Sequence, residues 1–363
     1  MARSACPPAR PRASWPCWTG APPRWPAPWS RPAAARSPPE EETALIKITR
    51  RAAMLGTLAT PALAQESWPA RTVRVIVPWA PGGTADIVAR LIFTSLSNRL
   101  GKPFVVENRS GAGGTVGAAA VAQAAPDGYT ILHDGTGISI TPALFPQLTY
   151  DPRRDFLPVF RPITVPQLVL VNPSLPARDI ASFIALAKNT PNRLDAASAG
   201  SGSLQHLVME LFAQRAGVQF NHVPYRGGAP AVNDLISGQV QVFFGNVNVS
   251  APFVRDGALR ALAHTGSGRL TSLPDVPPLS ETLPGFETSE WNGVFLPKGT
   301  PAPIVTALNR ALNEAIQDPE VAARLRAGDL QATPNTPEEF AAFFEAQSSL
   351  WQGFVREHNI RLG

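Results

Sequence analysis

Glycine and hydroxyl residues follow six apolar, β-branched runs of this chain. The junctions read VPW-APGGT, VVEN-RSGAGGT, ILHD-GTGIS, LDAA-SAGSGS, HVPY-RGGA and QVFF-GNVN. Glycine lets the backbone approach a ligand closely and adopt positive φ. A helix that starts just after such a loop offers unpaired N–H groups and the positive end of its dipole, which suits an anion. The junctions predict an anion site built from backbone groups, and tight capped turns are the alternative for any one of them.

The spacing of these glycines argues against nucleotide phosphates. Val116 stands where the dinucleotide fingerprint needs glycine in GAGGTVG, and Gln205 stands there in GSGSLQ. No Gly-Lys-Ser/Thr sequence follows any of the loops, which excludes a P-loop. Backbone N–H and hydroxyl groups with little fixed positive charge nearby favour carboxylates over polyphosphates.

Catalytic signatures are missing from the sequence. No G-x-S-x-G elbow and no H-E-x-x-H occurs, both cysteines (Cys6 and Cys17) precede residue 65, and the five histidines lack metal-ligand spacing. A pair of carboxylates that meets only in the folded chain stays open as an alternative. We expect no enzyme, no cofactor and no metal.

The net charge of +5 comes from the N-terminal segment. Of 32 Lys and Arg and 27 Asp and Glu, residues 1–64 hold nine and three, which leaves 23 basic and 24 acidic residues beyond them. No basic field remains, so we expect no nucleic-acid partner.

The N-terminal segment divides into an extension and an export signal. Residues 1–44 are rich in Pro, Arg and Ala without periodicity, and we interpret them as disordered or as a misassigned start. Residues 45–64 combine a basic region, a short apolar run and an Ala-Leu-Ala end, which is typical of a secretory signal peptide, through either the general or the twin-arginine route. We therefore expect a mature protein that begins at Gln65, is soluble and resides in the periplasm.

Strand-like and helix-like segments alternate through the rest of the chain. Apolar spacing predicts helices over 84–100, 180–189, 204–216, 303–316 and 338–355, with strands between them. This alternation predicts an α/β fold with mixed, parallel-rich sheets flanked by helices. Proline-rich breaks at 158–166 and 274–284 are candidate points where the chain passes between two lobes. We expect residues 65–163 plus 290–363 to form lobe 1 and 164–289 to form lobe 2, with a ligand cleft between them.

Six segments carry a resemblance to a known family. WPARTVRVIVPWAPGGTADIVAR, GKPFVVENRSGAGGTVGAAAVAQAAPDGYTIL, YDPRRDFLPV, ASAGSGSLQHL, VPYRGGAPAVNDLISGQV and LPKGTPAPIV are similar to the substrate-binding receptors of tripartite tricarboxylate transporters, the Bug family. The resemblance covers essentially Trp68 to the C-terminus. It implies a monomeric, two-lobed, type II-like periplasmic binding protein that closes on a small organic acid and delivers it to a membrane permease.

The resemblance also implies ligand-binding residues. In the family one ligand carboxylate is held by the loop after the first strand and by the loops facing it, mostly through backbone N–H groups, hydroxyls and water. Carried onto this sequence, the first-lobe candidates are Trp79, Ala80, Gly82, Gly83, Thr84, Asp86, Thr136 and Ser139. The second-lobe candidates are Ser198, Gly200, Ser203, His206, Tyr225, Arg226, Gly227 and Asn246. We expect Thr84 to cap its helix and Asp86 to orient the loop, since two negative groups repel.

Two positions depart from the family pattern. Trp79 stands where relatives usually carry Phe or Tyr, and we expect it to pack on the stem of the ligand. Gly245 stands where many carry an acid, so we expect an opened or neutral distal pocket, without an acid for the ammonium of an amino acid. A receptor that presents its closed form to a signalling partner would share this fold and stays open as an alternative function, as does a secreted α/β enzyme that acts on a carboxylate.

Overall fold

A computed structural model of the protein describes residues 68–191 and 193–361. The predicted extension (1–44) and signal peptide (45–64) lie outside these residues. Within them, none of the helices combines the length and the apolar character needed to span a bilayer.

Nine strands form one connected ladder in the described part of the chain. They are β1 (Val73–Val77), β2 (Phe104–Asn108), β3 (Thr130–Gly135), β4 (Phe156–Val171), β5 (Asp195–Ser198), β6 (Asn221–Pro224), β7 (Val242–Asn246), β8 (Arg260–His264) and β9 (Ser289–Pro297). Their order is β2-β1-β3-β9-β4-β7-β5-β6, and β8 also pairs with β4. The sheet is mixed, as predicted.

Strand β4 divides this ladder into two half-sheets. The first half-sheet contains β1, parallel to β2 and β3, and β9, antiparallel to β3 and to the first part of β4. The second contains the Gln167–Val171 part of β4, antiparallel to β7 and β8, with β5 parallel to β6 and β7. The prediction of a break in regular structure at 158–166 is wrong, because these residues belong to β4. The chain passes between the half-sheets within this strand. The division into lobes stays a prediction.

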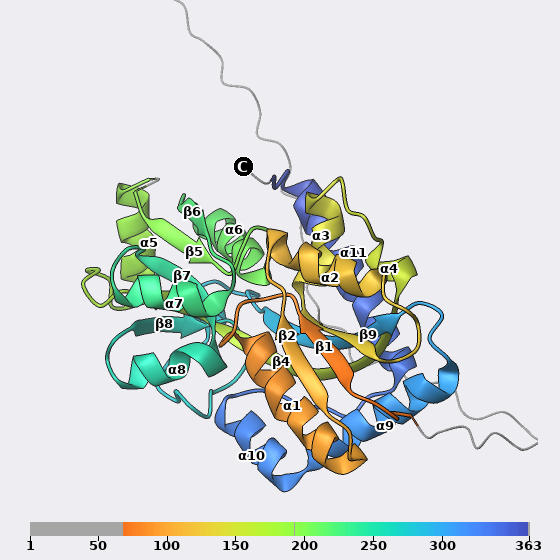
Figure 1. Ribbon diagram of the computed structural model, residues 1–363. Coiled ribbons are helices and arrows are strands. Elements are labelled where there is room, and N and C mark those ends of the chain that lie inside the picture. The colour runs from red at the N-terminus through yellow and green to blue at the C-terminus, as the bar shows by residue number, and fades with distance from the viewer. Residues whose placement is uncertain (1–67, 192, 362–363) are drawn as a thin grey trace, which may run out of the picture. The chain divides into compact units, whose positions relative to one another are not determined.

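Helices cover the half-sheets (Figure 1). They are α1 (Thr84–Leu100), α2 (Thr115–Ala122), α3 (Gly137–Leu144), α4 (Pro152–Asp155), α5 (Ile180–Asn189), α6 (Leu204–Ala216), α7 (Gly228–Ile236), α8 (Val247–Arg255), α9 (Ala302–Gln317), α10 (Pro319–Ala327) and α11 (Pro337–Glu357). Helix α9 packs against α1 and α11 packs against α3, so the C-terminal helices return to the first half-sheet.

The core explains why α1 sits where it does. Its Val88, Ile92 and Phe93 are fully buried in one apolar cluster with Val73 and Val75 of β1. Each such side chain contributes about 1.5–3 kcal/mol by leaving water. This packing fixes the first turn of α1 at the carboxyl end of β1.

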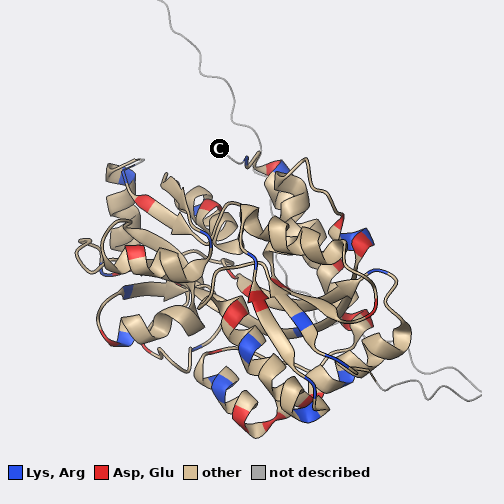
Figure 2. Cartoon of the chain, viewed as in Figure 1, with Lys and Arg blue, Asp and Glu red and all other residues tan. Residues whose placement is uncertain are grey.

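Charged side chains are spread over the helices. In the view of Figure 2, basic and acidic residues are interspersed.

Candidate functional site

The glycine junctions converge on one pocket, which we call the main pocket. Five of the six junctions contribute to its lining, which consists of Trp79, Gly83, Thr84, Ala85, Gly135, Gly137, Ala199, Ser203, Leu204, Gln205, Gly227, Gly228, Phe243, Asn246, Val249, Glu290 and Asn292. Both half-sheets supply these residues. The architecture therefore brings together segments that are far apart in the sequence.

The N-termini of helices α1 and α7 line this pocket. Helix α1 starts at Thr84 and α7 at Gly228. Their N-cap residues, Gly83 and Gly227, have no side chain that could accept a hydrogen bond from the first amides of the helix. The first amides of a helix lack intrahelical acceptors and carry the positive end of the dipole. Helix α6 starts in the same place, where the Ser203 hydroxyl caps the amide of His206 at 3.3 Å. The main pocket thus offers backbone donors without a fixed positive charge.

A chain of side-chain hydrogen bonds crosses from α1 to the second half-sheet. Asn246 Nδ2 donates to Thr84 Oγ1 at 2.9 Å, and Thr84 Oγ1 donates to Asn248 Oδ1 at 2.9 Å. Gln205 Nε2 donates to Asn246 Oδ1 at 3.1 Å and lies 3.3 Å from Glu290 Oε2. Thr84 is 7% exposed, so these bonds form away from water. The Thr84 hydroxyl bridges the two half-sheets and makes no cap bond to its own helix, contrary to the prediction.

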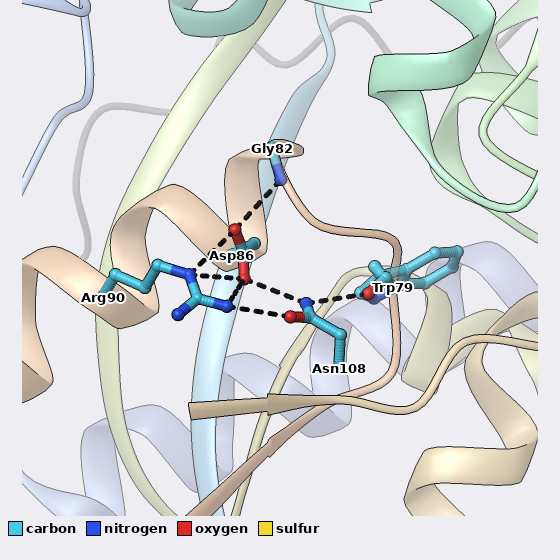
Figure 3. A network of polar contacts seen from close by, with 5 residues as sticks. All are labelled: Trp79, Gly82, Asp86, Arg90 and Asn108. Atoms are coloured by element: carbon cyan, nitrogen blue, oxygen red, sulfur yellow. Dashed lines mark hydrogen bonds and ion pairs between the residues drawn. The ribbon is translucent and has the colours of Figure 1, made fainter. Parts of the chain in front are cut away.

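Asp86 holds the loop after β1 in shape (Figure 3). Its carboxylate accepts from the Gly82 amide at 3.0 Å, from Asn108 Nδ2 at 2.9 Å and from Arg90. Asn108 Nδ2 also donates to the Trp79 carbonyl at 3.0 Å. Burial alone would raise the pKa of Asp86, but these hydrogen bonds and the Arg90 charge together lower it. The Asp86 carboxylate already takes the Gly82 amide and does not line the main pocket.

Trp79 connects the site to a buried acid. Its Nε1 donates to Asp134 Oδ1 at 2.7 Å, and the Gly135 amide donates to the same oxygen at 2.7 Å. Gly114 and Gly137 lie against the indole, where an added Cβ would sit 3.2 and 3.0 Å from Trp79 Cζ2. The indole is thus held in place while one face lines the main pocket.

Two buried carboxyl groups at the site were not predicted from the sequence. Asp134 and Glu290 are 1% and 7% exposed. Burial, supplemented by the charge of Glu290, raises the pKa of Asp134 to about 7. Burial also raises the pKa of Glu290 to about 7, against hydrogen bonds from Thr136 and Gln205. An acid inside an otherwise apolar strand, as in SEWNGVFLP, is the signal that would have singled out Glu290.

The structure separates the predicted site residues into three groups. Trp79, Gly83, Thr84, Ser203, Gly227 and Asn246 line the main pocket. Gly200, Tyr225 and Arg226 line a second pocket beside it, which shares Trp79 and Ala199 with the main pocket and includes the remaining glycine junction, RSGAGGT. The remaining seven line neither pocket: Ala80, Gly82, Asp86, Thr136, Ser139, Ser198 and His206.

Several residues of the third group support the loops. Ser198 Oγ lies 2.7 Å from His222 Nε2, and the His222 ring stacks on His206 with centroids 4.1 Å apart. Burial lowers the pKa of His206 to about 3 and that of His222 to about 4, so both rings are neutral. Ser139 Oγ donates to the Thr136 carbonyl at 2.6 Å. In the described ranges, no three His, Cys, Asp or Glu side chains are arranged to hold a metal ion.

The expectation for Gly245 is wrong. Gly245 does not line the main pocket, and a Cβ there would lie 2.6 Å from Phe243 Cε1 and 2.8 Å from Ser250 Oγ. The Phe243 ring fills the space, so the missing acid does not open the pocket. Glu290 supplies an acid from another strand, so the pocket does not lack one.

Comparisons with known proteins agree with this geometry. Residues 88–360 match the family model described as the tripartite tricarboxylate transporter family receptor. The protein BugT of Bordetella pertussis is 37% identical over 325 residues, which cover 87% of this chain and 100% of BugT.

Three solved structures share the fold of this chain. The periplasmic binding protein BugD is 33% identical with a TM-score of 0.78, covering 81% of this chain and 100% of its own. R. palustris Rpa4515 with adipate is 36% identical with a TM-score of 0.79, covering 81% and 100%. MatC from Rhodopseudomonas palustris with bound malate is 36% identical with a TM-score of 0.76, covering 79% and 99%. The fold is that of two-lobed periplasmic binding proteins, and the chain belongs to the tripartite tricarboxylate transporter receptor family.

Proposed function

We propose that this protein is a periplasmic receptor that captures a small organic carboxylate in the main pocket and delivers it to a membrane permease. The observation that carries the proposal is the convergence of uncapped N-termini of α1 and α7 on a pocket lined by both half-sheets. A carboxylate there would accept backbone hydrogen bonds from both sides. The adipate and malate complexes of relatives that are 36% identical support this class of ligand.

The proposal includes export and closure. Residues 45–64 would direct the chain to the periplasm, and residues 65–163 plus 290–363 would close on residues 164–289 as two lobes of a monomer. Closure follows because the ligand binds amides of both lobes only when they approach, which favours the closed form.

We propose binding without chemical conversion. The serine–histidine contact between Ser198 and His222 resembles part of a catalytic triad, but Ser198 is fully buried and lines neither pocket. A nucleophile needs access to its substrate.

The test is a ligand screen by thermal shift and Trp fluorescence on the purified protein. The panel holds mono-, di- and tricarboxylates, aromatic acids, amino acids and sugars. A ligand at 100 times its Kd should stabilise the fold by about 2.7 kcal/mol. The shift should vanish in Gly83→Val, which fills the main pocket, and persist in Gly353→Val, where an added Cβ meets nothing within 4 Å. A shift for sugars alone, or for no acid, would refute the proposal.

A further inference from the structure

Glu290 is a buried acid that faces the ligand site. It lies on β9, is 7% exposed and lines the main pocket. Glu290 Oε1 accepts from the Thr136 amide at 2.9 Å, and Oε2 accepts from Gln205 Nε2 at 3.3 Å. A carboxylate can accept about four hydrogen bonds, so acceptor capacity remains.

The charge of Glu290 has no cationic partner at this site. None of the residues that line the main pocket is Lys, Arg or His. Arg226, which directly precedes Gly227 in the sequence, lines the second pocket. Asp134 is the titratable group that faces Glu290 from β3, and it adds negative charge. Burial raises the pKa of Glu290 to about 7, so the carboxylate form that predominates at pH 8 lacks the cationic partner that a buried charge normally has.

Another part of the same pocket is suited to an anion. The N-termini of α1 and α7 meet there. Three hydrogen bonds connect the two parts, from Thr84 through Asn246 and Gln205 to Glu290, each 2.9–3.3 Å long. The anion-binding end and the acidic end are therefore close enough for one small molecule to reach both.

We infer that the ligand carries an ammonium group as well as a carboxylate, and that Glu290 is the residue that selects for the ammonium. The ligand carboxylate would accept from the amides of α1 and α7, and its ammonium would donate to Glu290. A ligand with a second carboxylate at that end would meet Glu290 and Asp134 as like charges. The inference rests on the proposed function, because it assigns the second end of the same pocket.

The main pocket also provides apolar walls for the stem of such a ligand. Trp79, Leu204, Phe243 and Val249 are among the residues that line it. Low local polarity strengthens a hydrogen-bonded ion pair and penalises an unpaired charge. Discrimination between an aminated acid and its amine-free counterpart should therefore be large here.

The experiment compares acids that differ only in the amine. Succinate and aspartate share a four-carbon skeleton, and adipate and 2-aminoadipate share a six-carbon one. Their dissociation constants are measured by titration calorimetry at pH 8 with wild-type protein, with Glu290→Gln and with Glu287→Gln. Glu287 is exposed and three residues away, which makes it the matched control. Urea denaturation of each variant checks that it folds.

The expected result is that wild type and Glu287→Gln prefer an aminated acid by about ten-fold or more, as for one hydrogen bond to a charged group. Glu290→Gln should lose this preference. The inference is overturned if the amine-free acids bind as tightly to wild type, or if Glu290→Gln keeps the preference. If none of the four binds while another acid without an amine does, the inference falls and the proposed function stands. If no acid binds at all, both fall.

Discussion

The backbone amide of Ala80 donates to the carbonyl of Arg226 at 3.1 Å. This bond joins the loop after β1 directly to the loop after β6. The contact is close because Gly227 has no side chain: a Cβ there would lie 3.0 Å from Ala80 Cβ and 3.1 Å from the Ala80 nitrogen. Gly227 of the RGG sequence thus allows the two half-sheets to meet beside the main pocket.

Gly227→Ala should weaken ligand binding by about ten-fold, because its methyl group separates these loops. Its φ of +143° also strains an L-residue, so some loss of stability is expected. Gly257→Ala is the control, since Gly257 has a φ of +73° and nothing within 4 Å of the added Cβ. Both variants should unfold at lower urea concentrations, and only Gly227→Ala should lose affinity in calorimetric titration. Equal affinities in the two variants would show that the loop contact is irrelevant to binding.

Thr84→Val should destabilise the fold by about 1–3 kcal/mol, because it leaves Asn246 Nδ2 and Asn248 Oδ1 without their partner in a buried site. The replacement keeps the shape of the side chain, so the loss reports the hydroxyl. Thr94→Val, at an exposed position of the same helix, should change the free energy of unfolding by less than about 0.5 kcal/mol. Urea denaturation of both variants measures the difference, and a Thr84→Val protein as stable as wild type would contradict the bridge.

Glu290 should make the ligand-free protein less stable as the pH rises. The pKa of this group is raised by burial to about 7 from its ordinary 4.5, so the folded state binds the extra proton between these values. Its contribution is present below pH 4.5 and is lost as the pH rises through 7, by about 3 kcal/mol at most. Asp134 titrates over the same range and shares the protons.

The measurement is the free energy of unfolding of wild type and Glu290→Gln from pH 5 to pH 8. The difference should grow in favour of the variant as the pH rises, whereas Glu287→Gln should run parallel to wild type. Parallel curves for Glu290→Gln as well would mean that Glu290 has an ordinary pKa.

His133 should limit stability in acid. Its ring is fully buried and packs edge-on against Phe93, with the ring centroids 5.9 Å apart. Burial lowers the pKa of His133 to about 4 from 6.5, so its contribution is present above pH 6.5 and is lost as the pH falls through 4. His133→Leu should therefore gain about 3 kcal/mol over wild type between pH 7 and pH 4. Urea denaturation at each pH tests this, and an unchanged pH profile would rule it out.

The helices that the sequence predicts best have both a regular apolar spacing and clear ends. Helix α5 begins and ends at the predicted residues, with Asp179 and Ser182 in a capping box at its start. Helices α1 and α6 also match, and each ends at a glycine in the left-handed conformation, Gly101 and Gly217. Local signals of this kind do not depend on distant contacts.

Strand β4 and the acidic end of the pocket depend on such contacts. Pro158 and Pro166 are typical of a break, yet both pair with β9 in an antiparallel ladder that shifts register twice between Pro158 and Ile163. Asp134 and Glu290 meet because β3 pairs with β9, which places Asp134 opposite Gly293. Five glycine junctions line one pocket, and that this pocket binds the ligand stays a prediction; the acid within it arises from strand pairing that the sequence does not reveal.

Strand β4 has a mechanical consequence. One continuous strand runs through both half-sheets, so they are connected by a hydrogen-bonded strand and not by a flexible linker. Opening the receptor would have to twist that strand, and the twist would concentrate at Pro166 and Gln167, where β4 stops pairing with β9 and starts pairing with β7. Such a strand has a preferred twist, and its torsional stiffness would help to determine how fast the receptor releases what it holds.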